Sequence, residues 1–134
     1  MQIRSYDEIQ SWKKGIELTK KIYTLTSNPP LSKDWSLCDQ MRRAAVSISS
    51  NIAEGFERNN NNEFTRYLVI SKGSAGELRT QIIIAYHVGY LSESQYLQVL
   101  QEINHIMIML GSFITYLKKL KASKTRKHAN PPTR

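Results

Sequence analysis

Residues that cross-link or break a fold are scarce in this chain. Its 134 residues include one cysteine, six glycines and four prolines. Because Cys38 has no partner within the chain, no internal disulfide can form, and a reducing compartment fits. Residues 1–7 contain no apolar stretch of the kind found in a secretion signal, and no uninterrupted apolar run approaches the ~18 residues of a membrane span. We therefore expect a cytoplasmic protein with no membrane span.

The chain also lacks the residue patterns of the common enzyme classes. It has no Gly-rich phosphate loop and no nucleophile motif. Glu102 and His105 have the spacing of half a di-iron centre, but a complete centre in a helical bundle needs a second such pair, and the sequence has none. We therefore expect no catalytic residue, no metal site and no cofactor, and we predict a non-enzymatic protein.

Acidic residues are fewer than basic ones, 11 against 19, which gives a net charge of +8. The excess is uneven, because residues 121–134 contain five basic side chains and no acidic one. With 40% hydrophobic and 22% charged residues, the composition is that of a soluble globular domain long enough to bury its own core. The expected molecule is a mildly basic body with a strongly basic end.

Apolar residues recur at spacings of three and four, the pattern of helices that pack on a core. Turn-forming signals at residues 28–30, residues 59–62 and Gly89 separate four such stretches. Short connections favour an all-α, antiparallel up-and-down four-helix bundle over residues 1–122. Residues 123–134 have no apolar periodicity and are predicted to be a disordered basic tail. The predicted helices cover about residues 6–28, 36–57, 62–88 and 92–122.

The same spacing predicts which side of each helix faces the core. Ser36 is the expected N-cap of the second helix, and Trp35 is expected to pack its large apolar surface against the end of the bundle. The fourth helix has a heptad seam, which predicts shallow left-handed packing. The predicted inner faces are Ile9, Trp12, Ile16, Thr19 and Tyr23; Leu37, Met41, Ala44, Ile48 and Ile52; Phe64, Leu68, Ser71, Ala75, Leu78, Ile82 and Tyr86; and Tyr96, Leu100, Ile103, Met107, Leu110, Ile114 and Leu117.

Two stretches, residues 82–86 and 106–110, are apolar all the way round their helices. An isolated bundle needs only one apolar stripe on each surface helix, so the remainder predicts subunit contacts along the third and fourth helices. Gly73 and Gly76 in the middle of the third helix fit close approach of another backbone or a bulky side chain. The alternative is a scatter of exposed isoleucines with no partner.

Polar residues raise two further possibilities. The second helix has a regular polar stripe, Arg43, Ser47, Asn51 and Glu54, which is either solvated or paired with another helix.

Near the end of the chain, basic residues either solubilise a helix end or form an arm that neutralises phosphates, and we favour the second interpretation slightly. These basic residues are Lys118, Lys119, Lys121, Lys124, Arg126 and Lys127.

Three segments together resemble a known family. They are residues 42–48 (RRAAVSI), 50–55 (SNIAEG) and 73–78 (GSAGEL), and they look like the signature of the 23S rRNA-intervening sequence proteins. The similarity extends over about residues 5–120, with Ser49 in place of the usual proline and Gly76 in place of a typical alanine. It implies a homopentameric ring of four-helix bundles without a settled biochemical activity. The residues that match are Arg43, Ser47, Asn51, Glu54 and Glu77, which we interpret as structural.

The family is also similar to the accessory variability protein of diversity-generating retroelements. That similarity implies, as expectations, association with nucleic acid and with a reverse transcriptase. Our leading hypothesis is a non-enzymatic, oligomeric bundle that binds RNA or DNA electrostatically through its basic C-terminal end. The alternatives are a protein-interaction scaffold of unknown partner and, more weakly, attachment of the basic helix end to a membrane surface.

Overall fold

The computed structural model describes the backbone of residues 3–129 and the side chains of residues 3–123. Two short 3₁₀ helices precede the long helices of the first half, η1 (Tyr6–Glu8) and η2 (Leu31–Lys33). The long helices are α1 (Gln10–Thr26), α2 (Trp35–Glu57), α3 (Asn61–His87) and α4 (Glu93–Ala129).

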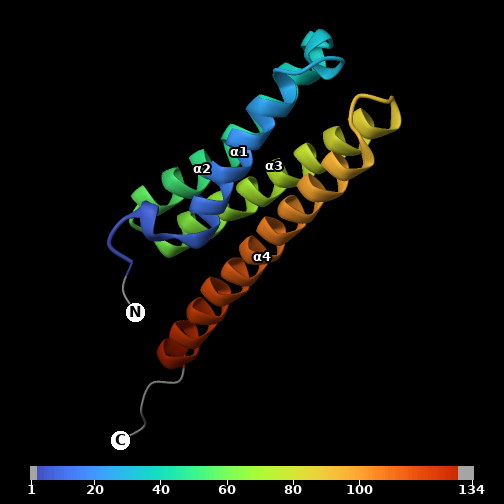
Figure 1. The fold of residues 1–134 in the computed structure, drawn as a ribbon. Helices are drawn as coiled ribbons and strands as arrows, with labels where there is room; N and C mark the ends of the chain where they lie inside the picture. The colour runs from blue at the N-terminus through green and yellow to red at the C-terminus, as the bar shows by residue number, and fades with distance from the viewer. Residues whose placement is uncertain (1–2, 130–134) are drawn as a thin grey trace, which may run out of the picture.

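Successive helices run in opposite directions (Figure 1). The α1–α2 and α3–α4 connections lie toward one end, while the α2–α3 turn and the last turns of α4 lie toward the other. Each helix packs against the next one along the chain, and α1 also contacts α4. The predicted all-α, up-and-down four-helix bundle is therefore confirmed.

Local hydrogen bonds explain where the helices begin and end. The Asn60 side chain accepts from the Glu63 amide at 3.0 Å, and Ser92 and Gln95 form a reciprocal capping box. Gly89, with φ of 88°, follows the last turn of α3 as predicted. The prediction of Ser36 as N-cap is wrong, because the Asp34 carboxylate caps α2 by accepting from the Leu37 amide at 3.1 Å.

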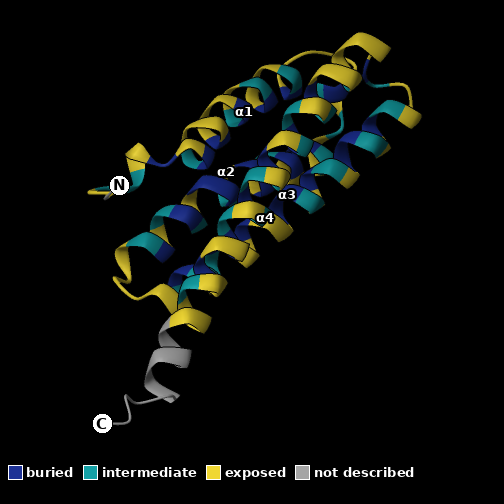
Figure 2. Ribbon diagram, turned by 90° about the horizontal axis from the view of Figure 1, so that it is seen from below, coloured by how far each residue is buried: buried dark blue, intermediate teal, exposed yellow. Residues whose placement is uncertain are grey.

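Buried residues line the inside of the bundle (Figure 2). The predicted inner faces of α2 and α3 are largely confirmed, since only Leu37 and Tyr86 of those residues are partly exposed. On α4 the predicted seam is confirmed at Ile103, Leu110, Ile114 and Leu117, which are buried. Val99 and Ile106 are also buried, while Leu100 and Met107 are only partly covered. Helix α4 contacts both α3 and α1, so its buried side is wider than one seam.

The predicted inner face of the first helix is only partly right. Ile9, directly before α1, is buried as predicted, but Ile16 and Tyr23 are 37% and 44% exposed. The buried face of α1 itself consists of Ser11, Gly15, Leu18, Ile22 and Thr26. Small and polar residues let α1 lie close to α2. A Cβ atom on Gly15 would overlap the Ser49 hydroxyl, which itself donates to the Trp12 carbonyl at 3.0 Å.

The expectation that Trp35 packs against the end of the bundle is also wrong, because its side chain is 86% exposed. Leu31 is the buried anchor of the α1–α2 connection instead. The Tyr90 hydroxyl donates to Asp34 at 2.9 Å and so ties this connection to the one between α3 and α4. This hydrogen bond also raises the pKa of the Tyr90 hydroxyl, since the phenolate could not donate it.

Helix α4 continues to Ala129, past residue 122, where the apolar pattern predicted that the bundle ends. No glycine or proline interrupts residues 112–129, and alanine, lysine and arginine are good helix formers. Residues 130–134 lie outside the described part of the chain. The division into a bundle and a disordered tail from residue 123 therefore stays a prediction.

One segment of α4, Glu93–Ser123, is long and apolar enough to cross a membrane by length and composition alone. Its buried side chains, among them Ile103, Ile106 and Leu110, pack in the core of the bundle. The core helix of a bundle passes the same test of length and composition.

Candidate nucleic-acid interface

The three predicted basic residues whose side chains are described lie on the last turns of α4. Lys118, Lys119 and Lys121 are exposed, and none takes part in an ion pair among the described side chains. Helical spacing distributes them around α4, so their charges project in several directions. The side chains of Lys124, Arg126 and Lys127 lie outside the described residues.

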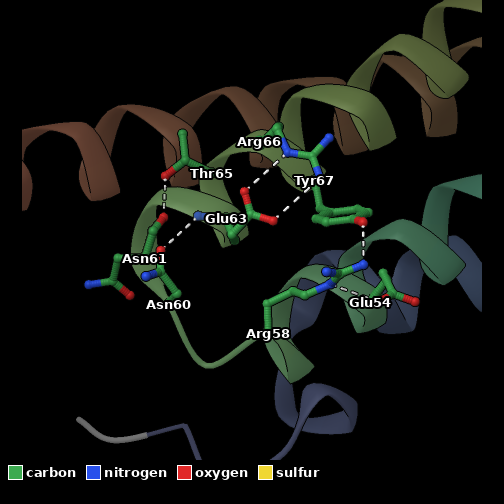
Figure 3. A network of polar contacts seen from close by, with 8 residues as sticks. All are labelled: Glu54, Arg58, Asn60, Asn61, Glu63, Thr65, Arg66 and Tyr67. Carbon is green, nitrogen blue, oxygen red and sulfur yellow. Dashed lines mark hydrogen bonds and ion pairs between the residues drawn. The ribbon is translucent and has the colours of Figure 1, made fainter.

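The α2–α3 turn brings two further cations to this end of the bundle (Figure 3). Arg58 follows α2 directly, and its guanidinium donates to the Tyr67 hydroxyl at 2.7 Å. Arg66 and Arg58 lie 4.6 and 5.1 Å from the Tyr67 ring centroid, close enough for cation–π attraction. This Arg58–Tyr67–Arg66 cluster depends on the tight turn, in which Asn59 has φ of 55°.

The charges of this cluster are partly compensated. Arg58 pairs with Glu54 at 3.0 Å and Arg66 pairs with Glu63 at 3.2 Å. The hydrogen bond from Arg66 lowers the pKa of the Glu63 carboxyl, because it stabilises the charged form. The lysines of α4 therefore supply most of the uncompensated positive charge at this end.

Sequence reasoning missed the cluster. The turn-forming signal at residues 59–62 located the turn correctly, and a turn at this position places Arg58 and Arg66 on either side of it. That signal could have found both arginines. The stacking of both on Tyr67 could not be read from spacing, because it depends on the angle at which α3 leaves the turn.

The polar stripe of α2 divides between two kinds of contact. Ser47 lies 2.8 Å from Ser74 of α3, and the Asn51 amide donates to the Ser47 hydroxyl at 2.8 Å. Arg43 pairs with Asp39 on its own helix, in an exposed position. Glu54 belongs to the cluster described above, and Glu77 is exposed on α3. Only the middle of the stripe therefore bridges two helices.

The outer face of α3 and α4 combines exposed apolar side chains with glycines, and we call it the α3–α4 outer face. A Cβ atom on Gly73 would meet nothing within 4 Å, and one on Gly76 would meet only the Met107 methyl, at 3.9 Å. Ile108 is 68% exposed on the same face. Packing within the chain therefore does not account for these mid-helix glycines. This face comprises Val69, Gly73, Gly76, Ile84, Leu97, Ile108 and Gly111.

Glu102 and His105 do not come together with further ligands. Glu102 forms an ion pair with Lys21 of α1 at 2.8 Å, and His105 is exposed beside it. Among the residues that the structure describes, no three histidine, cysteine, aspartate or glutamate side chains are grouped closely enough to hold a metal ion.

Fold and sequence together define the class: a bundle of four antiparallel helices with signature segments on α2 and α3. The model of the 23S rRNA-intervening sequence proteins matches residues 7–112, and the chain belongs to that family. The chain is also similar to a crystal structure, at 1.70 Å resolution, of a protein of unknown function from the S23 ribosomal protein family of Bacteroides thetaiotaomicron VPI-5482, with a TM-score of 0.72 and 23% identity. The match covers 78% of this chain and 97% of that one, and it shows the shared fold. No curated protein matches the sequence.

Proposed function

We propose that the protein is a cytoplasmic, non-enzymatic homo-oligomer that binds RNA or DNA through its basic end. The observation that supports this most is the placement of Lys118, Lys119 and Lys121. They are exposed, free of ion pairs among the described side chains, and at the same end as the Arg58–Tyr67–Arg66 cluster. Uncompensated lysines of this kind bind phosphates without reading base sequence.

Assembly is supported by the α3–α4 outer face. Helix-interior glycines cost about 1 kcal/mol each relative to alanine, and Gly73 has no intramolecular contact that requires its small size. A neighbouring copy seated on this face would explain both the glycines and the exposed Ile108. In the pentameric ring implied by the resemblance, each copy would present its basic end, so weak phosphate contacts would add through avidity.

The first test is the salt dependence of binding. If the protein displaces the counterions of about four phosphates from a single strand, raising the salt concentration from about 50 to 200 mM lowers its affinity for that strand by about 50-fold. Fluorescence anisotropy of a labelled oligonucleotide with nuclease-treated protein measures this slope. Affinity that does not change with salt would contradict the electrostatic mechanism.

The second test is truncation after Leu120, which removes the last basic residues and leaves the described core intact. Most binding should be lost, while light scattering should report the same assembly as for the full chain. The matched control is a full-length variant that removes charge without removing chain. In it, glutamine replaces Lys118, Lys119, Lys121, Lys124, Arg126 and Lys127. Unchanged binding in both variants would overturn the proposal.

The rival proposal is a scaffold for a polypeptide partner, such as the reverse transcriptase that the resemblance implies. Trp35 favours it, because tryptophan is enriched among the residues that dominate protein interfaces and this one is almost fully exposed. A partner that binds the wild-type protein after nuclease treatment, and is lost on Trp35→Ala, would support the scaffold.

A further inference from the structure

A hollow of about 460 Å³ opens at the basic end of the bundle, between the α2–α3 turn, residues 113–120 of α4 and Ile3 near the N-terminus. It lies within the size range of small-ligand sites. Its aromatic and amide lining residues include Phe56, Asn59, Asn60, Asn61, Phe113 and Tyr116. Neither the family nor the electrostatic proposal accounts for this combination of aromatic and amide side chains.

Aromatic rings form one side of the hollow. Phe64 is buried, and its ring meets those of Phe56 and Phe113 edge to face, with centroids 5.9 and 5.2 Å apart. Tyr116 stands at the rim and is 57% exposed. A flat aromatic ligand can therefore contact an exposed ring at the rim and a fixed apolar surface below it.

Amide groups also line the hollow. Asn60 uses its side-chain oxygen to cap α3, which leaves its amide nitrogen available, and Asn61 contributes only its backbone carbonyl to the Thr65 hydroxyl. The side chains of Asn60 and Asn61 project from the start of α3, apart from the contact between Arg58 and Tyr67 (Figure 3). Asparagine amides donate to and accept from the edges of nucleobases.

Positive charge lies close to the hollow along the chain. Lys118, Lys119 and Lys121 follow Tyr116 and Leu117, which line it, and Arg58 precedes the asparagines, but none of these four cations lines the hollow itself. An occupant with a planar aromatic group, hydrogen-bonding edges and adjacent negative charge fits all three features. We propose that the hollow receives an unpaired base of a single-stranded nucleic acid, whose flanking phosphates bind the nearby lysines of α4. This inference rests on the proposed nucleic-acid binding and names its preferred substrate.

Single strands are favoured over duplexes for a physical reason. A base in a duplex has both faces stacked and its pairing edge occupied, so it can enter the hollow only after costly extrusion. A single strand offers a free base at no such cost, and stacking on an exposed aromatic ring is the usual contact in single-strand binding.

The experiment compares three fluorescein-labelled probes by anisotropy: a 16-nucleotide single strand of DNA, the same strand with abasic positions in place of its central bases, and the duplex. The variants are Tyr116→Leu, Tyr116→Phe and, as the matched control for loss of an exposed aromatic residue, Trp35→Leu at the opposite end of the bundle. Circular dichroism and the thermal midpoint establish that each variant is folded.

The wild type should bind the single strand about tenfold more tightly than the abasic strand, which has the same phosphate charge. Tyr116→Leu should abolish that difference, whereas Tyr116→Phe and Trp35→Leu should keep it. Equal, salt-dependent binding of all three probes would overturn the base-binding hollow and leave the electrostatic proposal standing. Absence of salt-sensitive binding to any probe would overturn both, and an equal effect of Trp35→Leu would show that the loss is not specific to the hollow.

Discussion

The inner helix crossings and the α3–α4 outer face both contain small residues. Only at the crossings does packing within the chain require these residues to be small. At Gly55 a Cβ atom would lie 2.6 Å from the Tyr67 Cβ and 3.3 Å from the Phe64 carbonyl oxygen. At Gly73 there is open space. Glycine at the first position is therefore required by the fold of one chain, whereas glycine at the second is not. The difference separates residues that hold the bundle together from residues that are free to serve an assembly.

The largest expected effect is on assembly. Ile108→Glu places a charge on the α3–α4 outer face, and burying it without a partner against another copy is costly. We expect the dissociation constant of the assembly to rise at least 100-fold, which corresponds to a loss of about 2.7 kcal/mol in the free energy of association. Light scattering should then report a mass near the 15.5 kDa of the single chain. Glu17→Gln, an exposed change on α1, is the control, and an unchanged mass for Ile108→Glu would assign the face no role in assembly.

At the α2–α3 crossing, Gly55→Ala should lower the free energy of unfolding by about 2 kcal/mol. The new methyl group would lie 2.6 Å from the Tyr67 Cβ, which can move only with the α3 backbone, and overpacking of this kind costs about 1–3 kcal/mol. Urea denaturation followed by circular dichroism measures the change. A stability equal to that of the wild type would mean that the crossing is looser than described.

A smaller loss is expected from Ser49→Ala at the α1–α2 crossing. The hydroxyl donates to the Trp12 carbonyl, and a single hydrogen bond of this type contributes about 1 kcal/mol. Ser112→Ala on the exposed surface of α4 is the matched control and should change the free energy of unfolding by less than about 0.5 kcal/mol. Equal losses at both serines would remove the distinction between the crossing and the outer surface.

The smallest effect has the opposite sign. Gly73→Ala should raise the stability of the isolated chain by about 0.5–1 kcal/mol, because alanine has the higher helix propensity and its methyl group meets nothing. Denaturation in the Ile108→Glu background measures this without interference from assembly. In the otherwise native chain the same methyl group should weaken the assembly, and a stabilised chain with an unaltered assembly would argue against close contact at Gly73.

The sequence predicts those parts of the fold that depend on local patterns, and it does not predict those that depend on contacts between helices. The inner faces of α2 and α3 follow from apolar residues that recur at helical spacing, and the caps at Asn60 and Ser92 follow from local hydrogen bonding. The buried face of α1 could not be predicted in this way. Gly15 is buried because Ser49 of another helix lies against it, and a periodicity of apolar residues cannot reveal such a contact.

The candidate site shows the same limit. The lysines near the end of α4 could be found from composition, because five basic residues follow position 120 without an acidic one. The Arg58–Tyr67–Arg66 cluster and the hollow beside it depend on the turn conformation at Asn59 and on which α4 residues reach that turn. Both are properties of the packed chain, and a linear pattern does not contain them.

Helix α4 has 37 residues and α1 has 17, which at ~1.5 Å per residue correspond to rods of about 55 and 26 Å. The shorter rod cannot cover the longer one, so the final turns of α4 reach beyond it into water. A helical extension is a preorganised spacer: much of the entropy of ordering its backbone is lost when the protein folds and not when a ligand arrives. If the lysines of the last turns bind phosphates, as proposed, the fixed rise of the helix sets the distance between the phosphates that they hold.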